Sequence, residues 1–523
     1  MNDLSRDSTH LIVNDQVQLF VDNLLLEQVQ DVTRRFHQPQ RFSDEPLIRK
    51  DQPWEHVTYF TYSNYAVIRD EADGLFKCWY EDLDMIPGRY PAPMAHRSRQ
   101  LYAYSEDGIH FVKPELDFFE VGGRKTNIIM GDDGDGWVHS ASFIIDPHAA
   151  TSDHRFRMLY SHQWEDQAGP HNRIEVAHSP DGIRWIVDRE YPTIGMSGPN
   201  LNDVSVLFYD HDARQFVQNT RHYLQWAGAT NLRHPHTSSF TAPHALDNWA
   251  LYNKRRVWQT RSHDFVHWSE PVLVAAADDG EDNLDDAYYG MSQFKVGTMH
   301  FACLGVLHCV DNTRDVRLLI SRDGLRWQSI NNRLPFLGAR GDGFWDGKLQ
   351  AICSPPIEMG DELWFYHGGA SATHDLWMCR NEGFVHPEHE DPNGVQYALG
   401  LAKLRRDGFA SLDTNGYREG TVITRAMLGL GRKLTINARC RPGGSIRVEV
   451  ADRYDEVIEP CAKQACDTFT GDSTCHEVTW GGSPDVPAGN EERRAWRKLR
   501  FFLRDAEVFS FRFTNVLGRP LAG

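Results

Sequence analysis

Four acidic residues occupy matching positions, each just before an apolar run with strand character. They are Glu55 in PWEHVTYF, Asp203 in NLNDVSVLFYD, Asp286 in NLDDAYYGMSQF and Asp346 in GFWDGKLQAI. Carboxyl groups that converge can cleave a glycosidic bond, because this chemistry needs one acid and one base or nucleophile. Crowded like charges would also raise the pKa of one member, as a proton donor requires. We therefore expect these four residues to form a catalytic group.

Other side chains, most of them near the same positions, are suited to binding a substrate. Imidazole, phenol and guanidinium groups form hydrogen bonds with hydroxyl or acidic groups, and an indole ring offers a flat face to a sugar. The candidates are His56, His139, Arg221, Tyr289 and Trp345. We expect them to hold a carbohydrate.

A seven-residue phrase recurs five times and indicates how these residues are positioned. It reads SEDGIHF at 105–111, SPDGIRW at 179–185, SHDFVHW at 262–268, SRDGLRW at 321–327 and RRDGFAS at 405–411. Its aspartates, at 107, 181, 264, 323 and 407, lie 74, 83, 59 and 84 residues apart, which suits a four-stranded blade plus a long loop. The repeat predicts a five-bladed β-propeller with blades near 55–114, 137–190, 200–275, 285–330 and 345–412.

The phrase itself predicts a turn. Asp-Gly favours a tight hairpin, since glycine adopts positive φ and the aspartate caps nearby backbone N–H groups. The Trp or Phe that closes the phrase is expected to pack against the neighbouring blade. These aspartates are therefore expected to be structural.

Three regions follow from the patterning. Residues 1–45 contain one or two strands that we expect to cover an edge of the propeller, and residues 46–418 form the propeller itself. Residues 419–523 include GSIRVEVAD, RKLRFFLRD and VFSFRFTN, which alternate apolar and polar residues with period two. This alternation predicts a C-terminal β-sandwich.

The composition excludes several partners. The formal net charge of −18 disfavours nucleic acid and anionic lipid, whose binding depends on Lys and Arg. No apolar run is long enough to span a membrane, and the first residues do not resemble a signal peptide. A cytoplasmic protein is expected, or a periplasmic one if a leader has been removed. The nine cysteines are expected to be thiols.

No cofactor or bound metal is expected from the motifs. The histidines of HPHTSSFTAPH (234–244) lack the spacing of a zinc site. GDDGDG (131–136) and DDGEDNLDD (278–286) are acidic loops that leave a structural calcium ion open, although neither has the full ligand ladder of an EF-hand.

The phrase SHDFVHW resembles the S-x-D-L-x-x-W phrase of five-bladed propeller glycosidases, the invertase/levanase and arabinanase families. YAYSEDGIHFVKP, KTNII, KLRRDGFASL, GSIRVEV and DAEVFSFRF resemble landmarks of a large bacterial group of glycosidase-like propeller proteins. The resemblance implies a propeller followed by a β-sandwich, and a glycosidase. The W-x-N-D-P-N-G, R-D-P and E-C motifs of invertase-type enzymes are missing, and DPNG at 391–394 is expected to be a turn. A fructosidase is therefore not expected.

The sequence predicts a glycoside hydrolase, exo-acting on an oligosaccharide, with Asp203 and Glu55 as the carboxylate pair. Asp286 and Asp346 would bind sugar or tune pKa values. A separation of about 5–5.5 Å between the two carboxyls would imply retention, and about 6.5–9.5 Å inversion.

Three alternatives stay open. A sialidase-like hydrolase would need an arginine cluster and a Tyr/Glu nucleophile pair at the channel. A non-catalytic carbohydrate-binding propeller would bind a glycan without turnover. A polysaccharide lyase would need a His or Tyr base beside an arginine, for which His139 and Tyr289 are the candidates.

Overall fold

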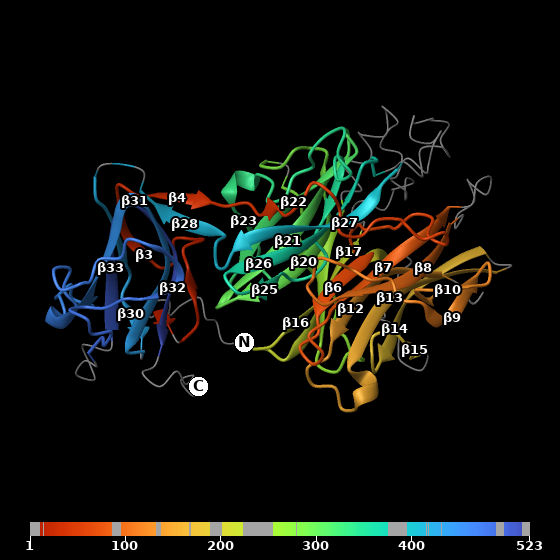
Figure 1. The fold of residues 1–523 in the computed structure, drawn as a ribbon, viewed down its shortest axis with the longest axis horizontal. Helices are drawn as coiled ribbons and strands as arrows, with labels where there is room; N and C mark the ends of the chain where they lie inside the picture. Colours follow the sequence, from red (N-terminus) through yellow and green to blue (C-terminus); the bar gives the residue numbers. More distant parts are fainter. Residues whose placement is uncertain are drawn as a thin grey trace.

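The computed structural model describes residues 11–514, apart from several segments and the side chains of some flanking strand residues. The segments left out are 14, 86–95, 132–136, 167–168, 189–200, 223–254, 279, 375–394, 415, 417, 430 and 488–495. Nearly all regular structure in the described part is β-strand, which confirms the prediction of an all-β chain. A propeller and a C-terminal β-domain lie side by side (Figure 1). No helix in the described part is both long and apolar enough to cross a membrane.

Five four-stranded blades make up the propeller in the described residues. Blade one contains β6 (Tyr65–Arg69), β7 (Phe76–Met85), β8 (His96–Ser105) and β11 (Ile128–Met130); blade two contains β12 (Trp137–Ile145), β13 (Phe156–Asp166), β14 (Gly169–Ser179) and β15 (Ile186–Val187); blade three contains β16 (Leu201–Asp210), β17 (Gln215–His222), β18 (Arg256–Ser262) and β19 (Val272–Ala275). Blade four contains β20 (Asp286–Val296), β21 (Met299–His308), β22 (Thr313–Ser321) and β23 (Gln328–Ser329); blade five contains β24 (Leu349–Ala351), β26 (Glu362–Ala370), β27 (Tyr397–Arg405) and β5 (Gln40–Arg41), with β25 (Ile357–Met359) also paired to β26.

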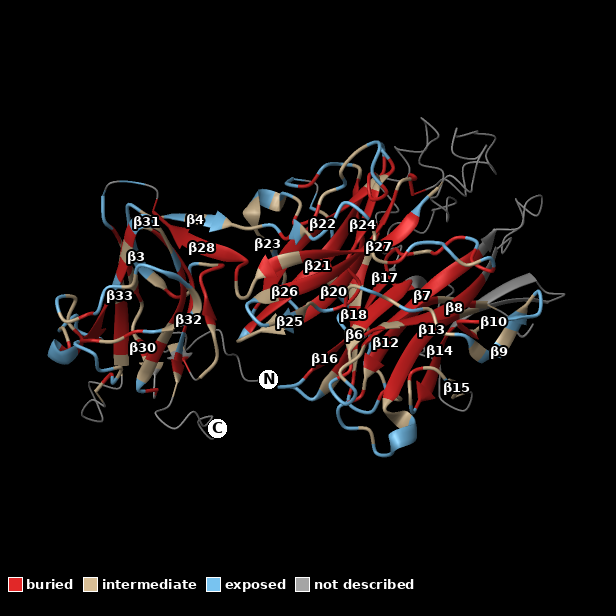
Figure 2. Ribbon diagram, in the orientation of Figure 1, coloured by how far each residue is buried: buried red, intermediate tan, exposed pale blue. Residues whose placement is uncertain are grey.

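Contacts between neighbouring blades close a ring. The innermost strands β6, β12, β16 and β20 contact one another in that order. Blade five meets blade four through the parallel pair of Arg314 and Leu349, and it meets blade one where the rings of Phe76 and Trp364 stack. Because each blade is covered on both faces, strands such as β20 and β21 are buried along almost their whole length (Figure 2).

Residues 59–64, here called the axial segment, directly precede β6 and fill the axis of the ring. Within this segment the Ser63 hydroxyl donates to the carbonyls of Ser140 in blade two (3.2 Å) and Ser205 in blade three (2.6 Å). It also accepts the N–H of Ser205 (2.8 Å). One side chain of blade one thus joins the innermost strands of the next two blades.

Blades four and five meet the same segment. The Tyr62 ring lies so close to Gly290 and Gly305 that a Cβ there would come within 2.9 and 2.3 Å of it. The Tyr62 hydroxyl donates to the carbonyl of Cys303 (3.2 Å), and the Cys353 thiol donates to the carbonyl of Thr61 (3.3 Å). The two glycines therefore leave space for the Tyr62 ring at the axis of the propeller.

Four of the five repeated phrases form the same turn. Asp181 accepts the N–H groups of Ile183 (2.9 Å) and Arg184 (2.8 Å), while Ser179 Oγ accepts the N–H of Gly182 (2.9 Å), whose φ is +79°. Equivalent bonds surround the other three aspartates, namely Asp107, Asp264 and Asp323. The predicted tight turn with a capping aspartate is confirmed at these positions.

These turns pack against the preceding blade through their fourth residue. Trp79 of blade one donates its indole N–H to the carbonyl of Gly182 (2.6 Å), and Tyr366 of blade five donates its hydroxyl to the carbonyl of Gly108 (2.7 Å). The closing Trp185 instead stays over its own blade, with its ring against Phe143. The corner glycine thus makes a contact between blades in both turns. The closing Phe111 of the first phrase also packs against the neighbouring blade, as predicted, with its ring centroid 6.1 Å from that of Tyr366 in blade five.

The fifth phrase joins the propeller to the C-terminal domain. Asp407 itself has a positive φ of 58° and accepts the hydroxyl of Ser510 (3.0 Å). Arg406 donates to Thr474 Oγ1 (2.7 Å), which also belongs to the C-terminal domain. Phe409 still stacks on Phe301 of blade four, with ring centroids 4.2 Å apart.

The C-terminal domain is one strongly curled sheet around a hydrophobic core. Its longest strands, β31 (Lys433–Asp452) and β33 (Trp496–Thr514), pair along their lengths, with register shifts after Asn437 and Cys440 that allow the sheet to bend. The remaining strands from this part of the chain are β28 (Ala410–Asp413), β29 (Gly420–Thr424), β30 (Met427–Gly429) and β32 (Asp472–Glu477). Because β28 pairs here, the domain starts before the predicted boundary at 418/419.

The N-terminal strands belong mainly to this sheet. The strands β1 (Leu11–Val13), β2 (Gln18–Leu19), β3 (Leu26–Gln30) and β4 (Thr33–Phe36) pair with β30, β33, β29 and β28, respectively. Phe20 and Leu25 are buried in the core of that domain, since it offers them a closed apolar environment. Residues 1–45 were expected to cover the propeller. The strand β5 does so at the outer edge of blade five, and Val17, Leu19 and Val21 pack against the apolar core of blades four and five.

We predict that Gly182→Ala destabilises the protein by about 3 kcal/mol, because it adds left-handed strain to overpacking. An added Cβ would meet the Trp79 ring at 2.7 Å. Gly74→Ala is the matched control, since Gly74 has a similar φ of +77° but nothing within 4 Å of the added atom. It should cost about 1 kcal/mol. Urea unfolding measures both, and equal losses would contradict the contact between blades.

Candidate functional site

The innermost strands all begin at the same end of the propeller, here called the mouth, and finish at the opposite, far end. Second strands run back toward the mouth, and third strands start there again, because neighbouring strands of each blade are antiparallel. Polar side chains can therefore reach the mouth from the start of first and third strands and from the end of second strands.

Glu81, near the mouth end of β7, forms a hydrogen-bonded pair with His139 of β12. Nδ1 of His139 lies 2.6 Å from the Glu81 carboxylate, which also accepts the Ser98 hydroxyl (2.6 Å) and the N–H of Ser140 (2.9 Å). Burial alone would raise the pKa of Glu81, but these contacts and a bond from Asn64 outweigh it and hold the pKa below its usual value. Glu81 is therefore a carboxylate, and with Nδ1–H directed at it, Nε2 of His139 is the proton-accepting nitrogen.

Tyr289, near the start of β20, forms a second pair with His374, which follows β26 of blade five. The Tyr289 hydroxyl and Nε2 of His374 lie 3.0 Å apart. The guanidinium groups of Arg255 and Arg314 lie 4.8 and 4.7 Å from the centre of the Tyr289 ring. Both arginines precede or start third strands, so blades three, four and five all contribute to this group.

Tyr59 of the axial segment lies between the two pairs. Burial chiefly raises its pKa well above the usual value. Tyr397, Tyr289 and Glu81 raise this pKa further, and the Arg314 guanidinium opposes the shift. Its ring packs against Tyr397, with centroids 5.0 Å apart. A neutral phenol thus separates the Glu81–His139 pair from the cationic side of the mouth.

Glu55, one of the predicted catalytic acids, is held inside blade one. Its carboxylate accepts the Tyr80 hydroxyl (2.7 Å) and the N–H groups of Asp51 (2.9 Å) and Gln52 (3.0 Å), and Lys113 lies 2.7 Å away. Its side chain is fully buried. These bonds anchor the segment that leads to the axial segment.

Asp286 is held inside blade four. It lies 2.8 Å from Nδ1 of His308 and 2.8 Å from Arg317. Burial would raise the pKa of Asp286, but His308 and Arg317 outweigh it and lower the pKa to about 2. Burial would lower the pKa of His308, but the bonds to Asp286 and Asp315 raise it to about 10. The imidazolium and the guanidinium thus neutralise this carboxylate.

Asp346 and Asp203 complete the predicted four acids. Asp346 is buried in blade five, where it pairs with Arg41 of β5 (2.7 Å) and Arg340 (2.5 Å). The three described acids share no partner with one another. Asp203 lies on β16 near the mouth, and its side chain is outside the described residues.

Of the four predicted binding residues whose side chains are described, two lie in the mouth and two have other contacts. His139 and Tyr289 lie in the mouth, as described above. Trp345 donates its indole N–H to the carbonyl of Asp44 (3.0 Å) and stacks on His367, and the N–H of the exposed His56 binds Asp82 (2.8 Å). The side chain of Arg221 is outside the described residues, as is the DPNG segment at 391–394.

Sequence reasoning missed Glu81, Arg314 and His374. Its acidic and histidine candidates came from the first strand of each blade or the residues just before it. Glu81 and His374 instead lie near or after the end of second strands, and Arg314 lies at the start of a third strand. The acidic pair that ends the apolar run FKCWYED was the available signal for Glu81.

One group of described side chains has donor atoms close enough to hold a metal ion. His154, His178 and Asp188 place one donor atom each within 4.8 Å of one another at the far end of blade two. Two imidazoles and a carboxylate suit a divalent transition metal. In the predicted acidic loop at 278–286, Asp282 instead pairs with Arg317 and Arg333. The loop at 131–136 lies almost wholly outside the described residues.

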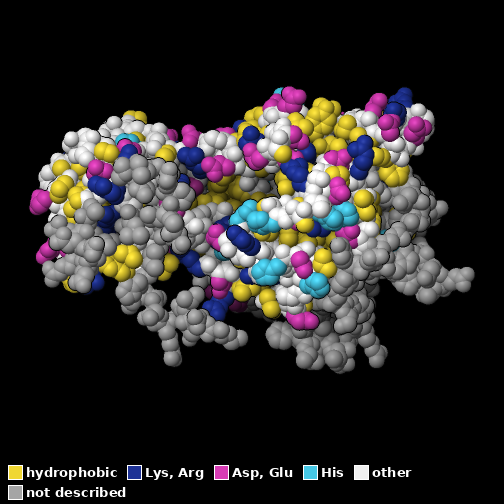
Figure 3. All heavy atoms as spheres, turned by 90° about the horizontal axis from the view of Figure 1, so that it is seen from below, with side chains coloured by type: hydrophobic (Ala, Val, Ile, Leu, Met, Phe, Trp, Pro, Cys, Tyr) yellow, Lys and Arg dark blue, Asp and Glu magenta, His cyan; other side chains and the backbone are white. Residues whose placement is uncertain are grey.

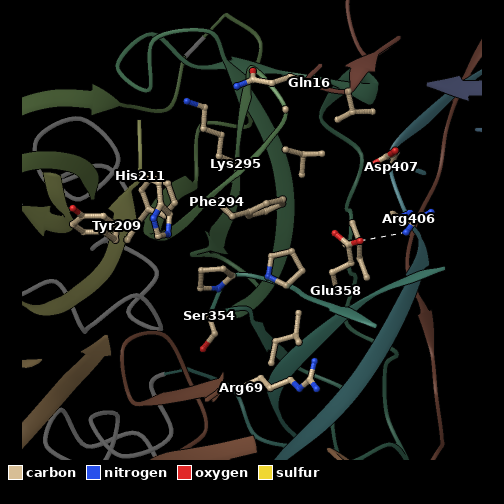
Figure 4. Close-up of a pocket in the computed structure, with 18 of the residues that line it drawn as sticks. Gln16, Arg69, Tyr209, His211, Phe294, Lys295, Ser354, Glu358, Arg406 and Asp407 are labelled. Atoms are coloured by element: carbon tan, nitrogen blue, oxygen red, sulfur yellow. Dashed lines mark hydrogen bonds and ion pairs between the residues drawn. The ribbon is translucent and has the colours of Figure 1, made fainter. Parts of the chain in front are cut away.

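The far end carries a cavity of about 1030 Å³ between the propeller and the C-terminal domain. Figure 3 shows a recess between the two lobes, with histidine, Lys and Arg side chains gathered beside it. Two of the cations that line it have acidic partners: Arg406 lies 3.3 Å from Glu358, as drawn in Figure 4, and Lys295 pairs with Asp212. Its lining contains neither the Glu81–His139 pair nor the Tyr289–His374 pair, so the mouth is the better candidate site.

The His308 pair predicts a pH-dependent stability. A histidine whose pKa rises on folding stabilises the protein fully below about pH 6.5, and this contribution disappears as the pH rises through about 10. We therefore expect His308→Gln to lower the free energy of unfolding by about 3 kcal/mol at pH 6, with the loss shrinking toward pH 10. Chemical unfolding across this range measures the difference. The exposed His263→Gln is the control, and a loss that grows with pH would contradict the assignment.

No protein-family model matches the chain, and no curated protein matches it by sequence. Solved structures similar to it include an N-acetylgalactosamine deacetylase from F. plautii in complex with blood group B trisaccharide, at 13% identity and a TM-score of 0.44, covering 73% of this chain and 97% of that one. A β-1,2-mannobiose phosphorylase from Listeria innocua has 12% identity and a TM-score of 0.44, with coverage of 70% and 96%. A thermostable family-43 glycoside hydrolase has 13% identity and a TM-score of 0.40, with coverage of 70% and 96%.

Proposed function

We propose that the protein is a carbohydrate-active enzyme, a glycoside hydrolase that cleaves a glycosidic bond at the mouth of the propeller. The observation that carries the proposal is the convergence of two proton-transfer pairs, Glu81–His139 and Tyr289–His374, from blades one, two, four and five. Groups from distant parts of the chain meet here within hydrogen-bonding distance of their partners. Structural packing alone does not require two such pairs beside the axis.

In this mechanism Glu81 assists His139, which is the general base. Hydrogen bonds keep the pKa of Glu81 low, so this carboxylate stays ionised and orients His139, whose Nε2 can take a proton from an attacking water. Asp203 supplies the second carboxyl that glycosidic cleavage needs. The backbone two residues beyond it is bound by Ser63, which also binds the strand of His139. The starts of β12 and β16 are therefore held next to each other.

Tyr289 and His374 would act on the sugar itself. A phenol and an imidazole in contact can donate to, or accept from, hydroxyl groups of the bound ring. Tyr59 and Tyr397 add aromatic surface beside them, with which the apolar face of a sugar can stack.

The test compares two buried glutamates of blade one. We expect Glu81→Gln to lower kcat at least 100-fold, because it removes the charge that orients His139. Glu55→Gln is the matched control: it should lower the melting temperature but leave kcat of the folded protein nearly unchanged. Release of sugars from a panel of oligosaccharides, followed by mass spectrometry, gives the rates.

Asp203→Asn should be as damaging as Glu81→Gln if both carboxyls act in the same reaction. Full activity of either variant would remove that residue from the mechanism. Binding of a glycan by the wild-type protein without any turnover would instead support the non-catalytic, carbohydrate-binding alternative.

A further inference from the structure

Arg314 is a buried cation that lacks an acidic partner. Its residue is only 1% exposed, and no described carboxylate forms an ion pair with it. Nε donates to the carbonyl of Gln350 (2.8 Å), and Nη2 donates to the hydroxyl of Thr61. Both acceptors are neutral, so the positive charge is solvated by dipoles but not balanced.

Three other buried arginines of the propeller each have an acidic partner. Arg99 lies 2.6 Å from Asp82, Arg317 lies 2.8 Å from Asp286, and Arg157 contacts Asp146. Burying a charge without a counter-charge is costly, and buried charges in proteins are usually paired. The absence of such a partner at Arg314 therefore needs an explanation.

Titratable groups near Arg314 do not supply the missing charge. Burial raises the pKa of Tyr59 and Tyr62 well above the usual value and raises the pKa of Cys353 to about 12, despite the opposing effect of the guanidinium. All three are neutral at pH 7. Glu81 is ionised but already paired with His139.

Unpartnered polar atoms gather in the same place. Nη1 of Arg314 and both side-chain polar atoms of Asn312 are buried without a hydrogen-bond partner, as is the hydroxyl of Thr373. Asn312 lies next to the Tyr289–His374 pair, because its carbonyl accepts the N–H of His374. Buried polar atoms normally have partners, so this group of donors and acceptors is suited to a polar ligand.

We propose that Arg314, Asn312 and Thr373 form a subsite for the carboxylate of an acidic sugar. The proposal rests on the proposed function and adds the substrate class to it. Nη1 of Arg314 and the Asn312 amide supply N–H donors for the two carboxylate oxygens, and Thr373 supplies a hydroxyl. The single charge of a carboxylate balances the single unpaired guanidinium, whereas a phosphate would bring a charge of about −1.5 to −2.

Binding of monosaccharides provides the first test. Galacturonate, glucuronate and N-acetylneuraminate are added to the full-length protein, with galactose and glucose as neutral controls and inorganic phosphate as a second anion. We expect at least one acidic sugar to raise the melting temperature while its neutral counterpart does not, since a ligand of the native state stabilises it. An equal shift with phosphate, or no preference for an acidic sugar, would overturn the proposal.

Substitutions at the subsite provide the second test. Arg314→Gln should weaken binding of the acidic sugar roughly 10- to 100-fold, because it removes a charge-assisted hydrogen bond. Asn312→Asp should place a carboxylate next to the guanidinium, so it should raise the melting temperature without ligand and weaken the acidic sugar's effect. Asn332→Asp, at an exposed position, is the matched control and should do neither.

The products of oligosaccharide cleavage separate this proposal from the proposed function. Cleavage next to a neutral sugar, with no binding of acidic sugars, would overturn the subsite and leave the hydrolase standing. Acidic-sugar binding that Asn312→Asp abolishes, without any cleavage, would support the subsite and contradict the hydrolase. An unsaturated acidic product, detected by ultraviolet absorbance, would support the subsite and replace hydrolysis by elimination.

Discussion

The axial segment is the constraint on which the rest of the propeller depends. Ser63 binds the innermost strands of blades two and three, and Tyr62 fills the space that two glycines leave in blade four. These contacts fix where the innermost strands of blades two, three and four lie around the axis. Because the same segment contains Tyr59 and Thr61, the residues that set the geometry of the ring also line the candidate site.

Two kinds of buried charge occur around the ring. Glu55, Asp286 and Asp346 are surrounded by cations from their own blade or its edge, and their carboxylates tie loops together. In the mouth, by contrast, Glu81 forms a hydrogen bond with a histidine that can exchange a proton, and the partners of Arg314 among the described residues are neutral. Charges that are fully compensated stabilise a fold, whereas charges that are not compensated are available to a ligand.

The sequence predicted the ring well, because the Asp-Gly phrase is local chemistry that repeats. It also identified His139 and Tyr289, which lie near the starts of first strands. Its acidic candidates were less informative, because their partners are distant in sequence: Asp346 binds Arg41, 305 residues away. No local pattern shows that such a carboxylate is already neutralised. Likewise, the missing partner of Arg314 is visible only in three dimensions.

The first strands of the chain are used in two places. The strands β1–β4 complete the C-terminal sheet, and β5 completes blade five, where it pairs with β27 some 360 residues later. Contacts this distant in sequence slow folding, because a long loop must close before they form. During synthesis, β1 to β5 must therefore remain without these partners until the strands from β27 to β33 have been made. Neither domain is a unit that could be excised and expressed alone.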